Sequence, residues 1–484
     1  MKPTNLLFLF SDQHTRRMTG CYGHPVVQTP HIDSLAERGT KFNNAYTNCA
    51  ICVPARASLA TGRYVHQIGN WDNAFPYDGS VPSWHHRLRE QGHCVDSIGK
   101  LHFSGPQNDH GFSEEVDPLH VVDGIGDLLG CIRDNPPFRN KLDGIYNAGP
   151  GDSTYLQYDA RNNTNTCQWL RDHANDDKPW AAFASFVCPH PPYIAPQALY
   201  DHYAAQDLDF PAQWRESDWP DHPEIDYFRQ FFGLTQQFDE ATIRKLIAAY
   251  YGVCTYLDQQ LGDVLKTLEE TGLSENTRII YSSDHGESLS ARGLTGKFTM
   301  YEEAVAVPFV MAGPDVPGGK TVNTPISLVD CFPTIVEAVG AEMTDEDQDL
   351  PGRSLWEIAQ NPDENRLVFS EYHAVGARTA HFMLRDQQYK YIHYAHSEPQ
   401  LFDLMADPDE LDNLVSSNNH QNTLQQFETE LRKMLDPEAI DAQAKADQAA
   451  KVEAFGGEEA VRQRGAFTNS PVPGEAPAFR TFDN

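Results

Sequence analysis

Short runs rich in apolar residues recur along the first part of the chain, and each of them ends in polar residues. The runs at 6–10, 94–98, 180–187 and 277–283 have the length and composition of buried strands in a parallel sheet. A longer segment, 240–272, repeats apolar residues at helical spacing and predicts one amphipathic helix packed on that sheet. The pattern therefore predicts an α/β domain with a large central, mostly parallel sheet flanked by helices.

The pattern changes after about residue 365. Alternating stretches at 380–385, 389–394 and 398–403 predict a short antiparallel sheet, and a helix is expected near 421–435. We therefore expect three parts: a catalytic domain at 1–365, a smaller C-terminal α+β subdomain at 366–435 and an arm at 436–484. The arm is rich in Ala, Glu and Gln and then in Gly and Pro. It is expected to pack on its own domain or on a neighbouring subunit, which leaves a homo-oligomer open.

Charge limits the partners that this chain of 484 residues can bind, because its formal net charge is −32. A strongly acidic protein is a poor match for the phosphate backbone of nucleic acids, and the same charge argues against anionic membrane surfaces. A site for an anionic ester would therefore have to be locally basic within an acidic protein.

The cysteines and the N-terminus bear on the compartment. The nine cysteines are an odd, scattered set with one lone CxxC at 49–52, which suits buried thiols in a reducing compartment. The apolar run at 5–10 is shorter than the roughly 7–15 residues of a signal-peptide core. No run approaches the ~20 apolar residues of a membrane span. We expect a cytoplasmic protein with no membrane partner.

Two predicted strands end in candidate metal ligands. Asp12 and Gln13 follow the first strand, and Asp284 and His285 follow the strand at 277–283. Sites in open α/β sheets form at the carboxyl ends of the strands, so these pairs are expected to meet although they are distant in sequence. Alternatively, Asp12 caps a helix or a turn.

Basic and imidazole side chains follow two other strands. Lys100 and His102 are two positions apart, so both point the same way and suit an oxyanion and a proton transfer. His190 stands between Pro189 and Pro191, which would hold a catalytic imidazole rigid. A surface lysine and packed histidines are the alternative interpretation of the same residues.

The segment Cys52-Val53-Pro54-Ala55-Arg56, followed by Thr61-Gly62-Arg63, connects these residues to one chemistry. Residues 55–61 are expected to be helical, which puts Cys52 at a helix N-terminus that favours anions. The pentapeptide alone would also suit a packed loop, but its position soon after a strand ending in an acid favours a site. It resembles the signature of the type I, formylglycine-dependent sulfatases of the alkaline phosphatase superfamily, and the likeness covers about residues 4–415.

The resemblance implies a reaction. A formylglycine-generating or equivalent enzyme would oxidise Cys52 to an aldehyde, and this metal-bound formylglycine would hydrolyse sulfate monoesters to sulfate and an alcohol. The substrate would be a small-molecule or saccharide sulfate ester. The resemblance makes Asp12, Gln13, Asp284 and His285, together with modified Cys52, the ligands of one divalent metal ion.

The resemblance also assigns roles to the basic residues. Arg56 and Lys100 would hold the hydroxyl groups of the hydrated aldehyde, and His102 would take the proton whose removal releases sulfate. The sulfate oxygens would be bound by Asn73, His190 and Lys297. Of these, His190 or Lys297 would be the general acid for the leaving group.

One departure from the common sulfatase pattern narrows the resemblance. Many members have two adjacent acids where this chain has Asp12-Gln13, and the pair resembles choline sulfatases and phosphonate monoester hydrolases. The stretches 22–27, 72–74 and 99–103 look most like choline sulfatase, whereas the C-terminal tail does not. An amide in place of a carboxylate leaves the metal open between Ca²⁺, which prefers oxygen ligands, and Mn²⁺, which also accepts His285.

Two other functions compete with sulfate-ester hydrolysis. The same site could hydrolyse phosphonate monoesters or phosphodiesters, which also carry one negative charge. A binding protein that has lost catalysis would lack Cys52, a metal-ligating acid or the basic cluster, and none of these is missing. The alcohol of the substrate depends on loops such as 116–137 and 371–373, which match no motif.

Overall fold

An eight-stranded sheet forms the centre of the computed structural model, which describes residues 3–363 and 365–482. In spatial order its strands are β11 (Lys320–Val322), β2 (Thr40–Phe42), β10 (Phe309–Ala312), β9 (Thr277–Ser283), β1 (Asn5–Asp12), β7 (Ala181–Pro189), β4 (Val95–Lys100) and β5 (Glu114–Leu119). Only β10 runs antiparallel to its neighbours, so the prediction of a large, mostly parallel sheet is confirmed.

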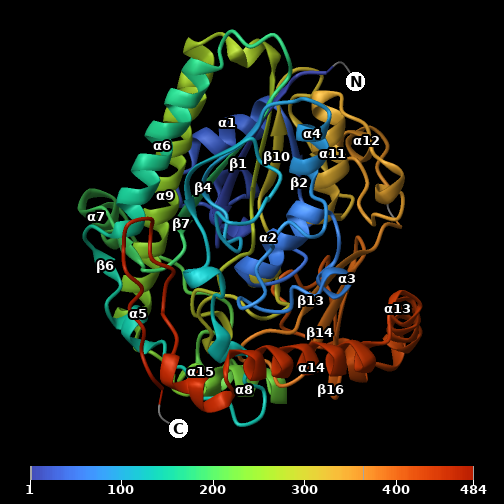
Figure 1. Ribbon diagram of the computed structural model, residues 1–484. Coiled ribbons are helices and arrows are strands. Elements are labelled where there is room, and N and C mark those ends of the chain that lie inside the picture. The colour runs from blue at the N-terminus through green and yellow to red at the C-terminus, as the bar shows by residue number, and fades with distance from the viewer. Residues whose placement is uncertain (1–2, 364, 483–484) are drawn as a thin grey trace.

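The alternation of side chains along β1 explains why helices cover both faces of the sheet (Figure 1). Leu6, Phe8 and Phe10 pack in one core with α2 (Cys52–Thr61), α4 (Trp84–Glu90) and α11 (Cys331–Val339). Leu7 and Leu9 pack on the opposite face with α6 (Thr154–Asp172) and α9 (Glu240–Glu270). A strand buried on both faces has to be apolar throughout, which is the pattern seen in the sequence. The long helix expected over 240–272 is α9.

The parallel partners of β1 fix which residues meet at the edge of the sheet. Strand β9 pairs with β1 as far as Ser11 and Ser283, and β7 pairs with it as far as Asp12 and Pro189. The residues that follow these strands therefore emerge side by side at one end of the sheet.

The other elements surround this framework. They include α1 (Pro30–Arg38), α3 (Val65–Ile68), α5 (Leu142–Tyr146), α7 (Gln197–Ala204), α8 (Pro223–Phe231), α10 (Glu302–Val305) and α12 (Leu355–Gln360), and the short strands β3 (Ala45–Tyr46), β6 (Gly149–Pro150), β8 (Ile194–Ala195) and β12 (Ile326–Ser327). Within the described residues, no helix is long and apolar enough to cross a membrane.

A second, antiparallel sheet follows in the C-terminal part, as the alternating stretches predict. Its strands, in order, are β13 (Val368–Tyr372), β14 (His381–Arg385), β15 (Tyr389–Tyr394) and β16 (Ser397–Asp403). The helix expected near 421–435 is α13 (Gln421–Met434). Strand β13 was not predicted, and it takes up part of the segment 371–373 that was expected to shape the pocket. Glu371 instead faces His66 and His373, at 3.0 and 2.8 Å.

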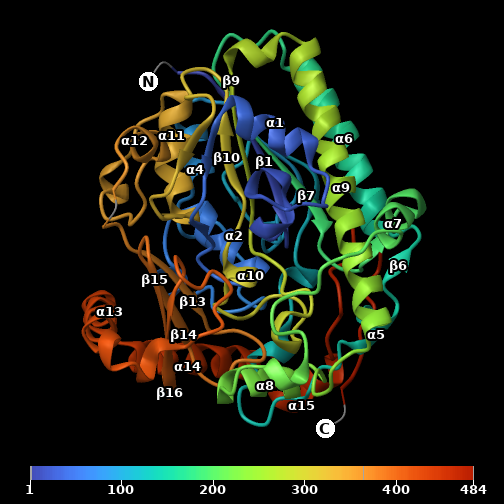
Figure 2. The same ribbon diagram turned by 180° about the vertical axis from the view of Figure 1, so that it is seen from behind.

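The arm packs on its own chain. It forms α14 (Pro437–Phe455), which runs across the region of the antiparallel sheet, and α15 (Glu458–Arg464), as Figures 1 and 2 show. Asp441 accepts a hydrogen bond from the backbone of Ala380, and Gln448 donates one to the carbonyl of His373. Residues 465–482 then turn back toward the end of the central sheet. The boundaries at residues 365 and 435 stay predictions.

Candidate active site

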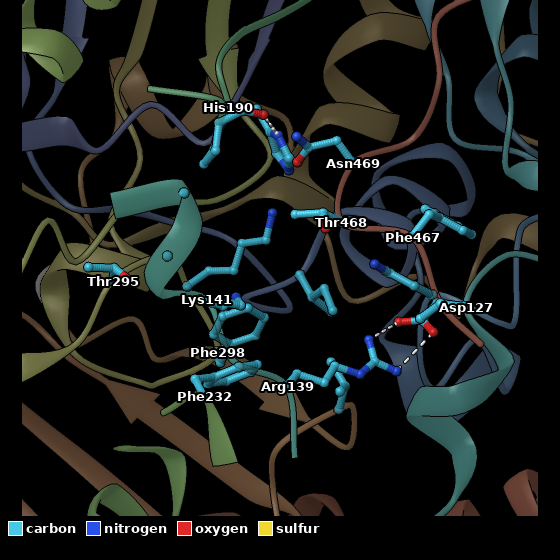
Figure 3. A pocket seen from close by; sticks show the side chains of 18 of the residues that line it. Asp127, Arg139, Lys141, His190, Phe232, Thr295, Phe298, Phe467, Thr468 and Asn469 are labelled. Carbon is cyan, nitrogen blue, oxygen red and sulfur yellow. Dashed lines mark hydrogen bonds and ion pairs between the residues drawn. The ribbon is translucent and has the colours of Figure 1, made fainter. Parts of the chain in front are cut away.

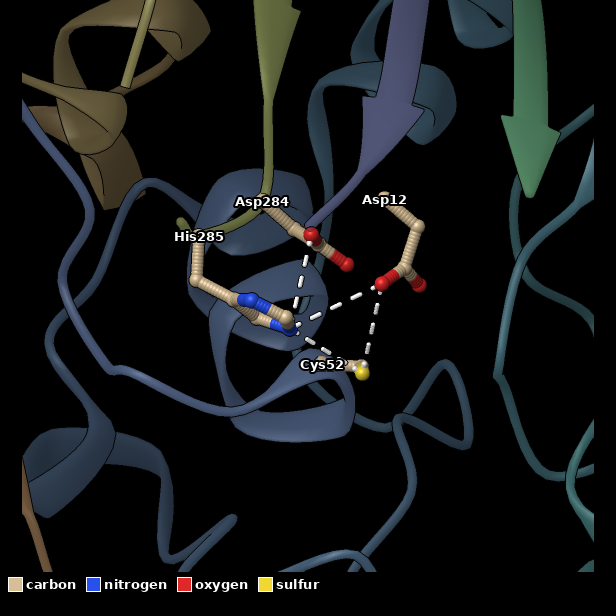
Figure 4. A group of neighbouring side chains, drawn as sticks. All are labelled: Asp12, Cys52, Asp284 and His285. Atoms are coloured by element: carbon tan, nitrogen blue, oxygen red, sulfur yellow. Dashed lines mark hydrogen bonds and ion pairs between the residues drawn. The ribbon is translucent and has the colours of Figure 1, made fainter. Parts of the chain in front are cut away.

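Four potential metal ligands meet where β1, β9 and α2 come together (Figure 4). Asp12 ends β1, Asp284 and His285 follow β9, and Cys52 is the first residue of α2. One ligand atom from each lies within 4.8 Å of those from the other three. The prediction that strand ends gather these distant residues is therefore confirmed in its geometry.

Gln13 joins the group through a strained backbone. Its φ of 67° lies in the left-handed region that residues other than glycine rarely adopt. This conformation lets its backbone N–H donate to Asp284 at 3.1 Å, while its side-chain oxygen accepts from Lys297 at 2.7 Å. The other end of the amide donates to Glu287, which also accepts from Tyr193 at 2.8 Å. Glu287 was given no role in the sequence analysis, and it fixes which atom of Gln13 faces the cluster.

The pKa values of the two carboxylates in the site are shifted in opposite directions. Burial raises the pKa of Asp12, but Lys100 and the other nearby cations outweigh this effect and hold the pKa well below its ordinary value. Burial and the charge of Asp12 raise the pKa of Asp284 to about 6, although Arg56 donates to it at 2.8 Å. Two buried carboxylates, one amide oxygen and one imidazole are a donor set that a hard divalent cation would satisfy, and such an ion would relieve the repulsion between the acids.

The thiol of Cys52 is an unreactive group as it stands. Its sulfur lies 3.1 Å from Nε2 of His285 and 3.1 Å from Nζ of Lys297. Burial, with Asp12 nearby, raises its pKa to about 11, so the thiol keeps its proton at neutral pH. Because the thiolate is the nucleophilic form, an unmodified Cys52 would be a poor nucleophile despite its place at a helix N-terminus.

A cavity of about 190 Å³ opens in front of the cluster (Figure 3). The predicted site residues on its wall are Gln13, Cys52, Asn73, His102, His190 and Lys297. The remaining two basic residues lie against the carboxylates: Lys100 pairs with Asp12, and Arg56 contacts both acids. The structure thus brings every predicted site residue into one region, with Arg56 and Lys100 in its deeper layer.

The two histidines on the wall are held in different ways. The Nδ1 of His190 donates to the carbonyl of Pro191 at 2.8 Å, because a carbonyl can only accept, and this leaves Nε2 as an acceptor. His102 contacts the hydroxyl of Ser470 through Nε2 at 2.9 Å. Burial and the nearby lysines lower the pKa of both imidazoles well below the ordinary value. Without a bound anion, each is therefore neutral and able to accept a proton.

Part of the wall comes from residues that sequence reasoning missed. The arm contributes Phe467, Thr468, Asn469, Ser470, Arg480 and Phe482, and other segments contribute Asp127, Lys141, Phe232 and Phe298. The hydroxyl of Tyr155 donates to the carbonyl of Ser470 at 2.7 Å and so anchors the arm over the site. Among these, only Asp127 lies in a segment, 116–137, that was expected to shape the pocket. The arm shows no spacing or motif that would have indicated its place.

Two family models match the chain. The model described as "Sulfatase" matches residues 4–341, and the model of the N-sulphoglucosamine sulphohydrolase C-terminal region matches residues 291–436. The choline-sulfatase of Rhizobium meliloti (strain 1021) is 31% identical over 468 residues, which cover 92% of this chain and 89% of that protein. The arylsulfatase K of Rattus norvegicus is 30% identical over 439 residues, covering 85% of this chain and 75% of that protein.

Solved structures share the fold. A 2-O GAG sulfatase superposes with a TM-score of 0.71 at 24% identity, covering 90% of this chain and 92% of the other. The phosphonate monoester hydrolase from Silicibacter pomeroyi gives a TM-score of 0.71 at 23% identity, covering 89% of this chain and 95% of the other. At this level of identity the likeness establishes the architecture alone.

Proposed function

This chain belongs to the sulfatase family of sulfate-ester hydrolases, as its motifs predict, and we propose that its nucleophile is a formylglycine made from Cys52. The observation that carries the proposal is the position of Cys52. It begins a buried helix and stands within reach of two acids and an imidazole, on the wall of the cavity. A modifying enzyme of the formylglycine-generating kind is the partner that this requires. The nine free cysteines favour a reducing, cytoplasmic setting.

We assign one divalent metal ion to Asp12, Gln13, Asp284 and His285, with the modified Cys52 as a further ligand. The oxygen-rich donor set suits Ca²⁺, and the single imidazole keeps Mn²⁺ open. When bound, the ion would supply positive charge that stabilises the anionic form of the nucleophile.

The residues around the nucleophile would divide the remaining work. The hydrated aldehyde offers two hydroxyl groups, one to attack sulfur and one whose deprotonation expels sulfate and restores the aldehyde. Arg56 and Lys100 would hold these hydroxyls, and neutral His102 would accept the proton of the second one. Ser470 would orient the His102 ring through their 2.9 Å contact. Asn73, His190 and Lys297 would bind the oxygens of the sulfate group.

The leaving alcohol needs a proton, and we expect Lys297 to supply it, or His190 in the imidazolium form that a bound anionic ester would favour. General acid catalysis is typically worth about 10²–10⁴-fold, and it matters most for poor leaving groups. His190→Ala and Lys297→Ala should therefore slow an alkyl sulfate far more than nitrophenyl sulfate, in at least one of the two variants. Turnover of both substrates by both variants measures this. Equal losses throughout would mean that the two residues only bind sulfate and that another group, such as His102, is the acid.

A panel of esters tests the proposed reaction against its alternative. Hydrolysis of phosphonate monoesters is the second candidate, because the Asp12-Gln13 pair resembles that of the phosphonate monoester hydrolases and both kinds of ester carry one negative charge. We expect kcat/KM to be highest for sulfate monoesters when small alkyl, aryl and saccharide sulfates are compared with phosphonate monoesters and phosphodiesters. A preference for the phosphorus esters would reverse the assignment.

A further inference from the structure

Lys141 directs an ammonium group into the cavity from outside the predicted site (Figure 3). It precedes α5, and its Nζ lies 3.9 Å from the ring centre of Phe298 and 4.1 Å from that of Phe232. The two rings stack with their centres 4.7 Å apart. The cation therefore rests on a fixed aromatic platform on the cavity wall.

Two other cations on the cavity wall, Arg139 and Arg480, each have an acidic partner. Arg139 forms a two-pronged ion pair with Asp127, and Arg480 lies 3.6 Å from Asp143. Within residues 3–363 and 365–482, no carboxylate lies within ion-pairing distance of the Lys141 ammonium. The ammonium of Lys141 therefore has no direct carboxylate partner, although Glu287 lies near enough to favour its charged form.

Lys141 is also close to the reaction centre. A Cβ atom placed on Gly296 would lie 3.5 Å from its Nζ, and Gly296 precedes Lys297, whose ammonium contacts Cys52 at 3.1 Å. Burial and the charge of Lys297 lower the pKa of Lys141 well below its ordinary value. Lys141 is half-buried, and one cation beside another is unfavourable, so an anion bound between them or next to them would favour its charged form.

We propose that Lys141 binds a second anionic group, a carboxylate or another sulfate, on the alcohol part of the substrate. The inference rests on the proposed function, since it takes the ester group to be held by Asn73, His190 and Lys297. A substrate with two anionic groups would place one at Lys297 and the other at Lys141, on neighbouring parts of the same wall.

The same geometry argues against a quaternary ammonium substrate. Aromatic faces are the usual partners of such a cation. Here the faces of Phe232 and Phe298 already hold the chain's own ammonium. A ligand cation would therefore find these faces occupied by the Lys141 side chain. Despite its similarity to a choline-sulfatase, this chain is expected to turn over choline sulfate poorly.

Matched aryl sulfates test the subsite. The probes are phenyl sulfate, meta- and para-carboxyphenyl sulfate, and resorcinol disulfate, with choline sulfate as the cationic comparison. A charge-assisted contact predicts that kcat/KM of the wild-type enzyme is about 10–100-fold higher for a substrate with a second anion than for phenyl sulfate. Lys141→Met should remove this preference and leave phenyl sulfate almost unchanged. Comparing the carboxyphenyl sulfates with resorcinol disulfate shows which anion the site selects.

Lys245→Met is the matched control. Lys245 donates to the carbonyl of Tyr146 at 2.7 Å, so it contacts the same helix α5 without belonging to the residues on the cavity wall. Its loss should leave the preference for a second anion intact. Melting temperatures of both variants exclude unfolding as the cause of any change.

Binding of benzoate to the resting enzyme, measured calorimetrically, gives a readout that does not depend on turnover. It should weaken in Lys141→Met and stay unchanged in Lys245→Met. Active enzyme with no preference for a second anion, or equal losses on every substrate in Lys141→Met, would overturn the subsite. A wild-type enzyme that hydrolyses no sulfate ester but binds benzoate through Lys141 would overturn the proposed function and leave the subsite standing.

Discussion

Replacing Cys52 by alanine is expected to lower kcat for sulfate esters by on the order of 10⁶-fold, the loss typical of removing a covalent nucleophile. The substitution removes one buried sulfur atom at the start of α2 and should leave the fold intact. The measurement is turnover of nitrophenyl sulfate, with mass spectrometry of the peptide that contains residue 52. In active wild-type enzyme that peptide should carry the aldehyde, and activity should follow the fraction of aldehyde.

Cys49→Ala is the matched control for this result. Cys49 is also a buried, free cysteine, three positions earlier, and it belongs to the apolar core next to the site. The variant should keep its formylglycine and most of its activity. Fully active enzyme whose Cys52 is an unmodified thiol would contradict the mechanism. Protein made without a modifying enzyme should be mostly thiol and nearly inactive, which agrees with the high pKa of that thiol.

The inner site could be predicted from the sequence because its signals are local. Asp12 ends one buried strand and Asp284 follows another, and parallel strands that pair in register must end at the same edge of the sheet. The Cys52–Arg56 segment begins a helix whose N-terminus faces that edge. For these residues, a short window of sequence and one rule of α/β architecture are enough to place the side chains together.

The outer wall could not be predicted because no local pattern records which distant segments meet. Ser470 reaches His102 only because the arm turns back after α14 and α15. Paired backbone hydrogen bonds between Ala466 and Arg480 close the loop that carries Ser470. Lys141 is a single lysine in a stretch without periodicity. Only its contacts with Phe232 and Phe298, which are distant in sequence, indicate a role. Strand β13 was missed for the same reason, since its pairing with β14 is what defines it. Substrate choice therefore depends on the part of the chain that is hardest to interpret from sequence.

Asp284→Ala is expected to abolish stable metal binding and to lower kcat/KM by about 10³-fold or more, because metal assistance is worth several kcal/mol of transition-state stabilisation. The variant also leaves Arg56 without its 2.8 Å acceptor, which should lower the free energy of unfolding by about 1–3 kcal/mol. Metal content of the purified protein and turnover of nitrophenyl sulfate measure the two effects. Added Ca²⁺ or Mn²⁺ should raise the melting temperature of the wild-type protein and not that of the variant.

Asp258→Ala separates loss of the metal from loss of stability. Asp258 is a buried acid on α9 that accepts the backbone N–H groups of His31 and Ile32, at 3.1 and 2.9 Å, at the start of α1. Burial raises its pKa to about 7, much as burial raises the pKa of Asp284. Its loss should cost about 1–2 kcal/mol, as the loss of a helix N-cap does, and should leave the metal and its thermal stabilisation in place. If Asp284→Ala kept its full complement of metal, or if Asp258→Ala lost it, the ion could not be held by the strand-end residues as we assign it.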